Sequence, residues 1–216
     1  MTIIYLIIIN IKNYGWLENF KIIIFEICII FLKKIKLNNL FYLEGKKQNY
    51  NSKFKFKVFD SPYLPCPYYF LYIINNIINK EIGLNKYNLI DFGCGAGRII
   101  KFFKGIFKKF YGIDINPIFA HYYENTDCKF INSDCRKKSL YSFFKKKKNF
   151  LFFFQPFDKE TILKIINIYK KNSKHVYVVL INYDGRKNLK GFRRIYEKKF
   201  NIKSKNILIY KQFIFR

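Results

Sequence analysis

Glycine and aspartate recur at close, regular spacing near the middle of this 216-residue chain, in the segment Asp91-Phe-Gly93-Cys-Gly95-Ala-Gly97. Three of the ten glycines of the chain fall within five positions. Glycine lets a backbone turn sharply and lets a ligand lie directly against it. The segment follows a predicted strand and opens a predicted helix, whose free N–H groups attract an anionic part of a ligand. These residues predict a ligand-binding loop, with a plain strand–helix turn as the alternative.

Two further aspartates stand at the ends of predicted strands. Asp114 ends the strand predicted for residues 109–114, and Asp134 follows the strand predicted for residues 128–133. An acid at the end of the second strand can bind both ribose hydroxyls of a nucleotide, as in nucleotide-binding folds generally. The alternatives are a helix cap for Asp114, a role that Asn116 could also fill, and a solvated cap for Asp134. Each acid alone is a moderate signal, and the ordered set is a strong one.

The elements that would position these residues alternate from residue 88 onward between short apolar runs and segments of helical spacing. Near-continuous apolar strands separated by helices indicate a parallel sheet that is covered on both faces. Two closing strands are joined by a loop too short for a parallel crossover, so we expect an antiparallel hairpin there. Strands are predicted at residues 88–92, 109–114, 128–133, 150–154, 175–182, 200–202 and 207–215, and helices at residues 96–107, 117–125, 136–147, 158–171 and 187–199.

The amino end is strongly apolar in two runs, at residues 2–9 and 22–32. Neither reaches the roughly 20 residues that a membrane-spanning helix needs, and Glu26 interrupts the second run. We therefore divide the chain into an apolar extension over residues 1–50 and an α/β domain over residues 51–216. The extension is expected to be an accessory helix packed on the domain, with an interfacial membrane helix or a spanning segment as the alternatives.

The net charge of +27 would ordinarily point to an anionic partner, such as a nucleic acid or an acidic membrane surface. Lysine, asparagine, isoleucine, phenylalanine and tyrosine are abundant while alanine and valine are scarce, which is typical of an AT-rich genome and explains much of the lysine excess. Five cysteines without a CxxC pair and two scattered histidines do not indicate a zinc site. We expect reduced thiols, no metal and a cytoplasmic location, with peripheral membrane attachment as an alternative.

The glycine loop and the two later acids resemble the cofactor motifs of class I S-adenosylmethionine-dependent methyltransferases. The resemblance implies a Rossmann-like, seven-stranded, mostly parallel sheet with an antiparallel C-terminal hairpin, helices on both faces, and S-adenosylmethionine as cofactor. It implies that Asp91 accepts from the ammonium of the methionine moiety, Asp114 binds the ribose and Asp134 accepts from the adenine amino group. The cofactor-binding residues predicted on this basis are Asp91, Gly93, Cys94, Gly95, Gly97, Asp114, Ile115, Asp134 and Cys135.

After the fourth predicted strand comes Gln155-Pro156-Phe157, and these three are the predicted catalytic residues. The segment resembles the Asn/Asp-Pro-Pro-Tyr/Phe motif of amino-group methyltransferases. In that motif an amide or carboxylate and a proline carbonyl accept from the target amine, and an aromatic ring stacks on it. This chain departs from it twice, because Gln155 replaces Asn or Asp and Phe157 replaces the second proline.

A Pro/Tyr-rich segment at residues 59–68 precedes the first strand. Together with the glycine loop it resembles a bacterial group of class I methyltransferases of undefined substrate, and more distantly the Dot1-like and mitochondrial lysine methyltransferases. In such folds this segment covers the cofactor. The resemblance therefore implies that Tyr63, Tyr68 and Tyr69 line the substrate entrance, while the alternative is that these rings fill core.

The function that these residues predict is transfer of a methyl group to an amine or hydroxyl of an unidentified, macromolecular acceptor. The acceptor could be a protein, with lysine slightly favoured, an RNA or a lipid-associated molecule, and an anionic membrane surface could be contacted through residues 22–32. The alternative is a catalytically inactive cofactor- or nucleic-acid-binding module that uses the basic surface.

Overall fold

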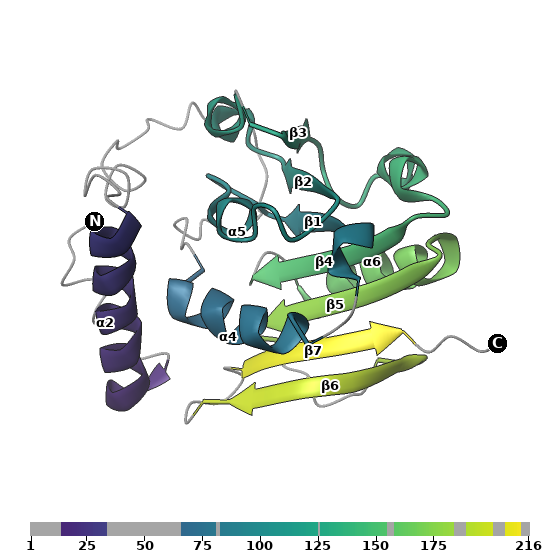
Figure 1. Cartoon of the computed structure of the whole chain (residues 1–216). Helices are drawn as coiled ribbons and strands as arrows, with labels where there is room; N and C mark the ends of the chain where they lie inside the picture. Colours follow the sequence, from purple (N-terminus) through teal and green to yellow (C-terminus); the bar gives the residue numbers. More distant parts are fainter. Residues whose placement is uncertain are drawn as a thin grey trace.

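A single seven-stranded sheet forms the centre of the protein (Figure 1). The structure is a computed structural model, and it describes residues 14–33, 66–80, 83–124, 126–154, 158–183, 189–200 and 206–212. The strand order is β3-β2-β1-β4-β5-β7-β6, with the first five strands of this order parallel and β7 antiparallel to both of its neighbours. This confirms the predicted Rossmann-like sheet with an antiparallel C-terminal hairpin. The strands are β1 (Asn88–Phe92), β2 (Lys109–Asp114), β3 (Cys128–Asn132), β4 (Lys148–Phe154), β5 (His175–Ile181), β6 (Phe192–Lys199) and β7 (Asn206–Gln212).

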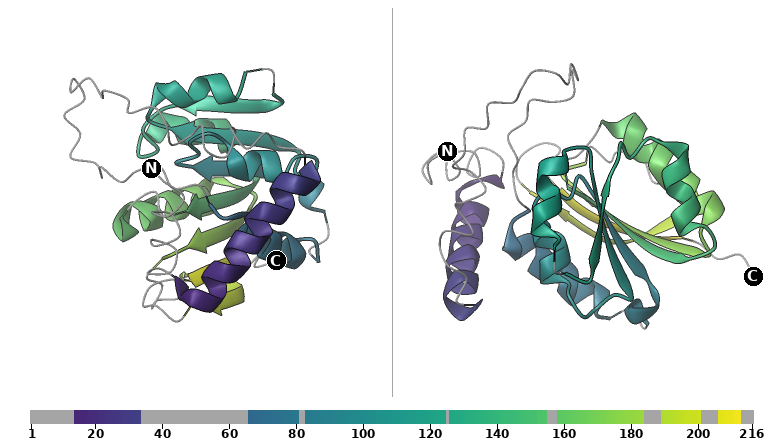
Figure 2. Two further views of the ribbon diagram at one scale, coloured as in Figure 1. Left: turned by 90° about the vertical axis from the view of Figure 1, so that its left-hand side faces the viewer. Right: turned by 90° about the horizontal axis from the view of Figure 1, so that it is seen from above.

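Helices cover the sheet on both faces (Figure 2). The first face carries α4 (Tyr68–Ile78) and α5 (Arg98–Phe102), with α2 (Trp16–Lys33) packed outside α4. The second face carries α6 (Lys159–Asn172) and the 3₁₀ helix η3 (Lys138–Phe144). Two further 3₁₀ helices, η1 (Leu84–Lys86) and η2 (Pro117–Tyr122), lie in the connections. Asp158 caps α6, because its carboxylate accepts from the N–H of Thr161 at 2.9 Å.

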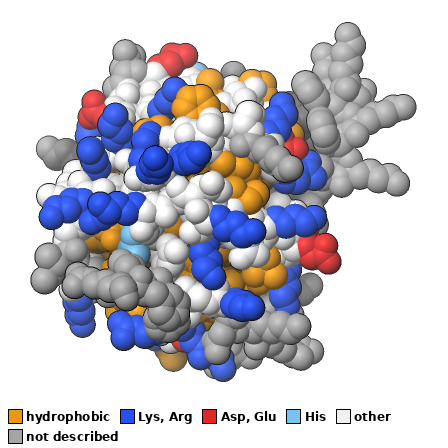
Figure 3. Space-filling view, turned by 90° about the vertical axis from the view of Figure 1, so that its right-hand side faces the viewer, with side chains coloured by type: hydrophobic (Ala, Val, Ile, Leu, Met, Phe, Trp, Pro, Cys, Tyr) orange, Lys and Arg blue, Asp and Glu red, His pale blue; other side chains and the backbone are white. Residues whose placement is uncertain are grey.

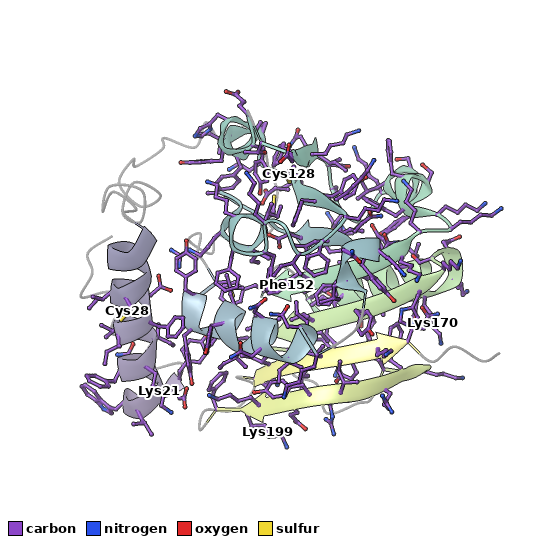
Figure 4. All side chains as sticks on the ribbon, viewed as in Figure 1. Lys21, Cys28, Cys128, Phe152, Lys170 and Lys199 are labelled. Carbon is purple, nitrogen blue, oxygen red and sulfur yellow. The ribbon has the colours of Figure 1, made fainter. Side chains whose placement is uncertain are left out.

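Alternation along the strands divides the apolar side chains between two cores. Successive side chains of a strand point to opposite faces, so Leu89 packs with α4 while Ile90 packs with α6. Phe152, in the middle of the sheet (Figure 4), belongs to the first core and its neighbour Phe153 to the second. All seven side chains of β5 are buried. Because both faces are covered, the central strands are apolar at nearly every position.

Three of the four described helical segments between the parallel strands are shorter than predicted or are 3₁₀ helices, while α6 has the predicted length. The helix predicted at residues 96–107 is only the five residues of α5. It starts late because Gly97, with φ of 76°, precedes the first helical residue, and Gly105, with φ of 86°, lies just beyond its end. The helices predicted at residues 117–125 and 136–147 are the 3₁₀ helices η2 and η3. Helical spacing alone did not separate a long α-helix from a short 3₁₀ segment.

The helix predicted at residues 187–199 is wrong, because β6 occupies residues 192–199. The closing hairpin is therefore made of β6 and β7. Of the strand predicted at residues 200–202, Phe200 lies in no strand, and residues 201 and 202 lie outside the described residues. Charged residues at helical spacing caused the error: Arg194 and Glu197 form an ion pair of 3.0 Å within an irregular edge strand. Pairing with β7 outweighs the local pattern.

The helix α2 packs against α4. Ile22 and Asn19 are buried, and the ring of Tyr14 meets that of Phe70 edge-on with centroids 5.0 Å apart. The opposite side of α2 is exposed and apolar at Trp16, Leu17, Phe20, Ile24 and Ile27. None of the helices that the structure describes, α2 included, is long and apolar enough to cross a bilayer.

A partly buried ion pair joins α2 to two other helices. The carboxylate of Glu26 accepts from the guanidinium of Arg98 at 3.1 and 3.2 Å and from the backbone N–H of Tyr68 at 2.6 Å. The guanidinium carbon of Arg98 also lies 4.6 Å from the centre of the Tyr68 ring, which adds a cation–π contact. Glu26 thus connects the first residue of α4 with the first residue of α5.

Replacing Glu26 by glutamine should destabilise the protein by about 3 kcal/mol, because Arg98 would remain buried without a counter-charge. Urea unfolding followed by circular dichroism measures the change. Glu124→Gln is the matched control: Glu124 is exposed and lies in no described ion pair, so its loss should change the free energy of unfolding by less than about 0.5 kcal/mol. Equal stability of the two variants would contradict a structural role for the ion pair.

Candidate functional site

The glycine loop connects β1 to α5 at the carboxyl edge of the sheet. Gly93, Gly95 and Gly97 have φ angles of 72°, 48° and 76°, a backbone region that side chains with a Cβ rarely adopt. The N–H of Gly93 donates to the carbonyl of Ile113 at 2.8 Å, which holds the loop against the end of β2. All three predicted glycines therefore adopt a backbone conformation that favours glycine, and of the three only Gly93 is exposed.

Close packing beneath the loop depends on two residues that sequence reasoning missed, Gly112 and Tyr123. A Cβ at Gly112 would lie 2.8 Å from the sulfur of Cys94 and 2.9 Å from the ring of Tyr123, so only glycine fits between them. The Tyr123 hydroxyl donates to the carbonyl of Gly95 at 3.1 Å. The sequence signal for Gly112 was its place inside a strand, where a glycine often marks a close approach.

Asp91 is the most unusual side chain of the site. It is 1% exposed, and neither of its carboxylate oxygens has a hydrogen-bond partner among the described residues. Burial, and then the nearby charge of Asp114, raises the pKa of this carboxyl well above its usual range. A buried carboxylate without a partner is costly to a folded protein. A ligand that brings a cation or hydrogen-bond donors to Asp91 would remove that cost.

Asp114 braces the loop at the end of β2. Its two carboxylate oxygens accept one backbone N–H each, from Gly95 at 3.0 Å and from Asn116 at 2.9 Å. Burial raises the pKa of Asp114, and these backbone N–H groups act in the opposite direction. Each oxygen keeps a further lone pair for another donor, so bracing the loop and binding ribose are compatible. The alternative cap of η2 is Asn116, whose side-chain oxygen accepts from the N–H of Ile118 at 3.1 Å.

Asp134 has a partner that the sequence did not indicate. Its carboxylate receives the guanidinium of Arg136 at 2.6 to 3.0 Å, and Arg136 holds the pKa of Asp134 below its usual range. The side chain of Arg136 is 55% exposed, so a ligand could share or displace this contact. Ile115 is 45% exposed beside Asp114 and offers an apolar surface at the same edge.

The two cysteines predicted at the cofactor site have buried side chains. Burial raises the pKa of the Cys94 thiol well above its usual range and that of Cys135 to about 12. Both thiols are therefore protonated at neutral pH and suited to packing rather than to nucleophilic chemistry. Their backbones remain at the edge, since each follows the carboxyl end of a strand.

The predicted substrate and catalytic residues are only partly described. The ring of Tyr68 lies under Arg98 of α5, and the hydroxyl of Tyr69 accepts from the ammonium of Lys198 in β6 at 3.1 Å, so both rings contact neighbouring elements of the fold. Tyr63 and the predicted catalytic segment 155–157 lie outside the described residues. The strand that precedes the segment, β4, ends beside β1 at the edge that carries the glycine loop.

Comparisons with known proteins support the fold. A candidate methyltransferase from Escherichia coli, yhhF, superposes with a TM-score of 0.54 at 14% sequence identity, over 70% of this chain and 89% of that one. A candidate methylase from Haemophilus influenzae superposes with a TM-score of 0.51 at 13% identity, over 67% and 89% of the two chains. No family model and no curated protein matches the sequence. The chain therefore has the Rossmann-like methyltransferase fold, and the similarity to Dot1-like and mitochondrial lysine methyltransferases finds no support.

The unpartnered carboxylate makes stability depend on pH. Because the folded-state pKa of Asp91 is raised, the ligand-free protein should lose stability as the pH rises from about 4 through that pKa. Asp91→Asn removes this titration, so the free energy of unfolding of the variant relative to wild type should increase with pH. Urea unfolding of both proteins at a series of pH values measures the difference, and a difference independent of pH would contradict the buried, unpartnered state.

Proposed function

We propose that this chain is an S-adenosylmethionine-dependent methyltransferase. The observation that carries the proposal is the Asp91 carboxylate, buried without a described partner beneath a loop of three glycines in the left-handed region. S-adenosylmethionine presents an ammonium, two ribose hydroxyls and an adenine. Its reactive group is the methyl group bound to the sulfonium sulfur. These three groups match the three acids Asp91, Asp114 and Asp134, which follow one another along one edge of the sheet.

Each residue of the site has a separate task in this proposal. Asp91 accepts from the ammonium, so cofactor binding neutralises the isolated carboxylate. Asp114 accepts from the ribose while it keeps the loop in place through Gly95. Ile115 packs on the adenine, and Asp134 accepts from its amino group in competition with Arg136. Much of the rate of methyl transfer comes from positioning and desolvation, so the site does not require a strong base.

The acceptor is proposed to be an amine or hydroxyl of a macromolecule, with protein lysine slightly favoured. Gln155, Pro156 and Phe157 follow β4 in the sequence. β4 itself ends beside β1 at the edge that carries the glycine loop, which is where a methyl group would leave the cofactor. The departure of this segment from the amino-methyltransferase motif favours a second candidate, a module that binds the cofactor without transferring its methyl group.

Binding measurements can test the proposed roles of Asp91 and Asp114 separately. S-adenosylhomocysteine carries the ammonium, the ribose and the adenine, whereas adenosine carries the ribose and the adenine without the ammonium. Asp91→Asn should weaken S-adenosylhomocysteine about tenfold or more and leave adenosine unchanged, while Asp114→Ala should weaken both. Isothermal titration calorimetry measures the affinities, and Asp127→Ala, an exposed acid at the other edge, is the control that should bind like wild type. Wild-type protein that binds neither ligand at near-millimolar concentration would refute the proposal.

Transfer of labelled methyl groups distinguishes an enzyme from a binding module. Incubation with methyl-labelled S-adenosylmethionine and fractionated lysate should label one fraction, and digestion with protease or ribonuclease then identifies its class. The label should fall strongly with Asp91→Asn, because that variant binds the cofactor poorly. Tight cofactor binding without any incorporation would instead favour the inactive module.

A further inference from the structure

Lysines gather at the edge of the sheet opposite the glycine loop. Lys109 and Lys148 are the first residues of β2 and β4, Lys129 is the second residue of β3, and Lys174 immediately precedes β5. At the other end, Asp91 and Asp114 stand near or at the carboxyl ends of their strands. Four of the five parallel strands thus have a lysine at or beside their start, and β1 and β2 have an acid near or at their end. We call the edge of the sheet that carries these lysines the amino-end face.

Neither codon usage nor ion pairing accounts for this arrangement. Codon bias sets how many lysines a chain contains, but it does not sort them to one edge of a sheet. None of the lysines of the amino-end face has an ion-pair partner among the described residues, and the described ion pairs of lysine are those of Lys21, Lys198 and Lys199. The face therefore carries uncompensated positive charge, and such charge attracts polyanions.

The amino-end face is hollowed rather than flat. An open hollow of about 610 Å³ lies between the α5–β2 connection and the start of β3. Four of its nine lining residues are lysines and one, Asp127, is acidic. Figure 3 views this side of the molecule and shows Lys and Arg side chains spread across it, with the acidic ones toward the margin. The lysines that line the hollow are Lys104, Lys108, Lys109 and Lys129.

An exposed aromatic ring stands among these cations. Phe143, in η3, is 52% exposed, and the ammonium of Lys129 lies 5.2 Å from the centre of its ring. The ammonium of Lys147 donates to the backbone carbonyl of Phe143. Proteins that bind single-stranded nucleic acid without sequence preference combine a basic groove with aromatic rings on which bases stack. Lys129, Lys147 and Phe143 supply both parts.

We propose that the amino-end face binds single-stranded RNA through its phosphates, with Phe143 as a stacking platform for a base. Lysine contacts phosphate as a point charge without the fixed fork that lets arginine recognise guanine, so the binding should tolerate different sequences. An anionic membrane fits the face less well. The exposed apolar side of α2, which a bilayer would take up, lies at the opposite edge of the sheet (Figure 1), so one membrane plane cannot contact both.

The proposal goes beyond the methyltransferase function and does not rest on it. The hollow and the glycine loop lie at opposite ends of the parallel strands, so charges on the amino-end face can be changed without touching the cofactor site. Failure of cofactor binding would leave RNA binding intact, and the reverse also holds. The RNA bound here is a docking partner, whether or not it accepts a methyl group.

A charge-reversal pair tests the face with the full chain and a fluorescent uridine oligomer of about 15 nucleotides. Lys108→Glu with Lys129→Glu should weaken binding at least about tenfold at 0.1 M salt and reduce the salt slope by about 0.7 for each phosphate that the protein no longer neutralises. Lys164→Glu with Lys199→Glu makes the same change in net charge on α6 and at the carboxyl edge (Figure 4), and should bind within about twofold of wild type. An equal weakening by both pairs would overturn the proposal, because net charge alone would then explain it.

Phe143→Leu separates stacking from charge. Leucine keeps an apolar side chain but has no ring, so the oligomer should bind about fivefold or more weakly with an unchanged melting temperature and salt slope. Wild-type affinity in this variant would overturn the stacking role. Vesicles containing phosphatidylserine provide the competing partner: binding to vesicles that depends on Lys108 and Lys129, with no binding of the oligomer by wild type, would overturn RNA in favour of a membrane.

Discussion

Parallel alignment of the central strands is the constraint on which the rest of the molecule depends. Parallel strands must all end at the same edge of a sheet, so acids that are far apart in the sequence meet there. In this chain Asp91 and Asp114 come from adjacent strands whose residues are in direct register, with Asp91 opposite Gly112. The same alignment collects the opening lysines at the other edge. One topological rule therefore produces both the candidate cofactor site and the basic surface.

The site is held in locally unfavourable states by the structure around it. Three loop glycines occupy the left-handed region, and Asp91 is buried without a described partner. Such states persist only where surrounding contacts determine them, and they concentrate at functional sites. Here the contacts are the Tyr123 hydroxyl on Gly95, the Asp114 carboxylate on the Gly95 N–H, and two large apolar cores on either side of the sheet.

The five parallel strands, the antiparallel end of the sheet and the positions of the three acids relative to the strands could be predicted from the sequence, because apolar runs and glycine spacing depend on local chemistry. What escaped prediction depends on contacts between distant residues. Residues 192–199 have a helical pattern of charges, and only their pairing with β7 makes them a strand. Glu26 interrupts an apolar run in the sequence, yet Arg98, which it binds, lies 72 positions away. Arg136 on Asp134 was missed for a different reason, since a short-range ion pair leaves no periodic signal.

The anchors of α2 have a consequence for synthesis on the ribosome. Glu18 pairs with Lys198, 180 positions later in the chain. A ribosome that adds about 5–20 residues per second needs roughly 10–35 s to cover that distance. Through this interval the nascent chain carries α2 without Lys198, the partner of Glu18. Glu26 likewise has no ion-pair partner until Arg98 has been added. α2, the first helix of the described part of the chain, thus gains its full set of contacts only after almost all of the domain has been synthesised.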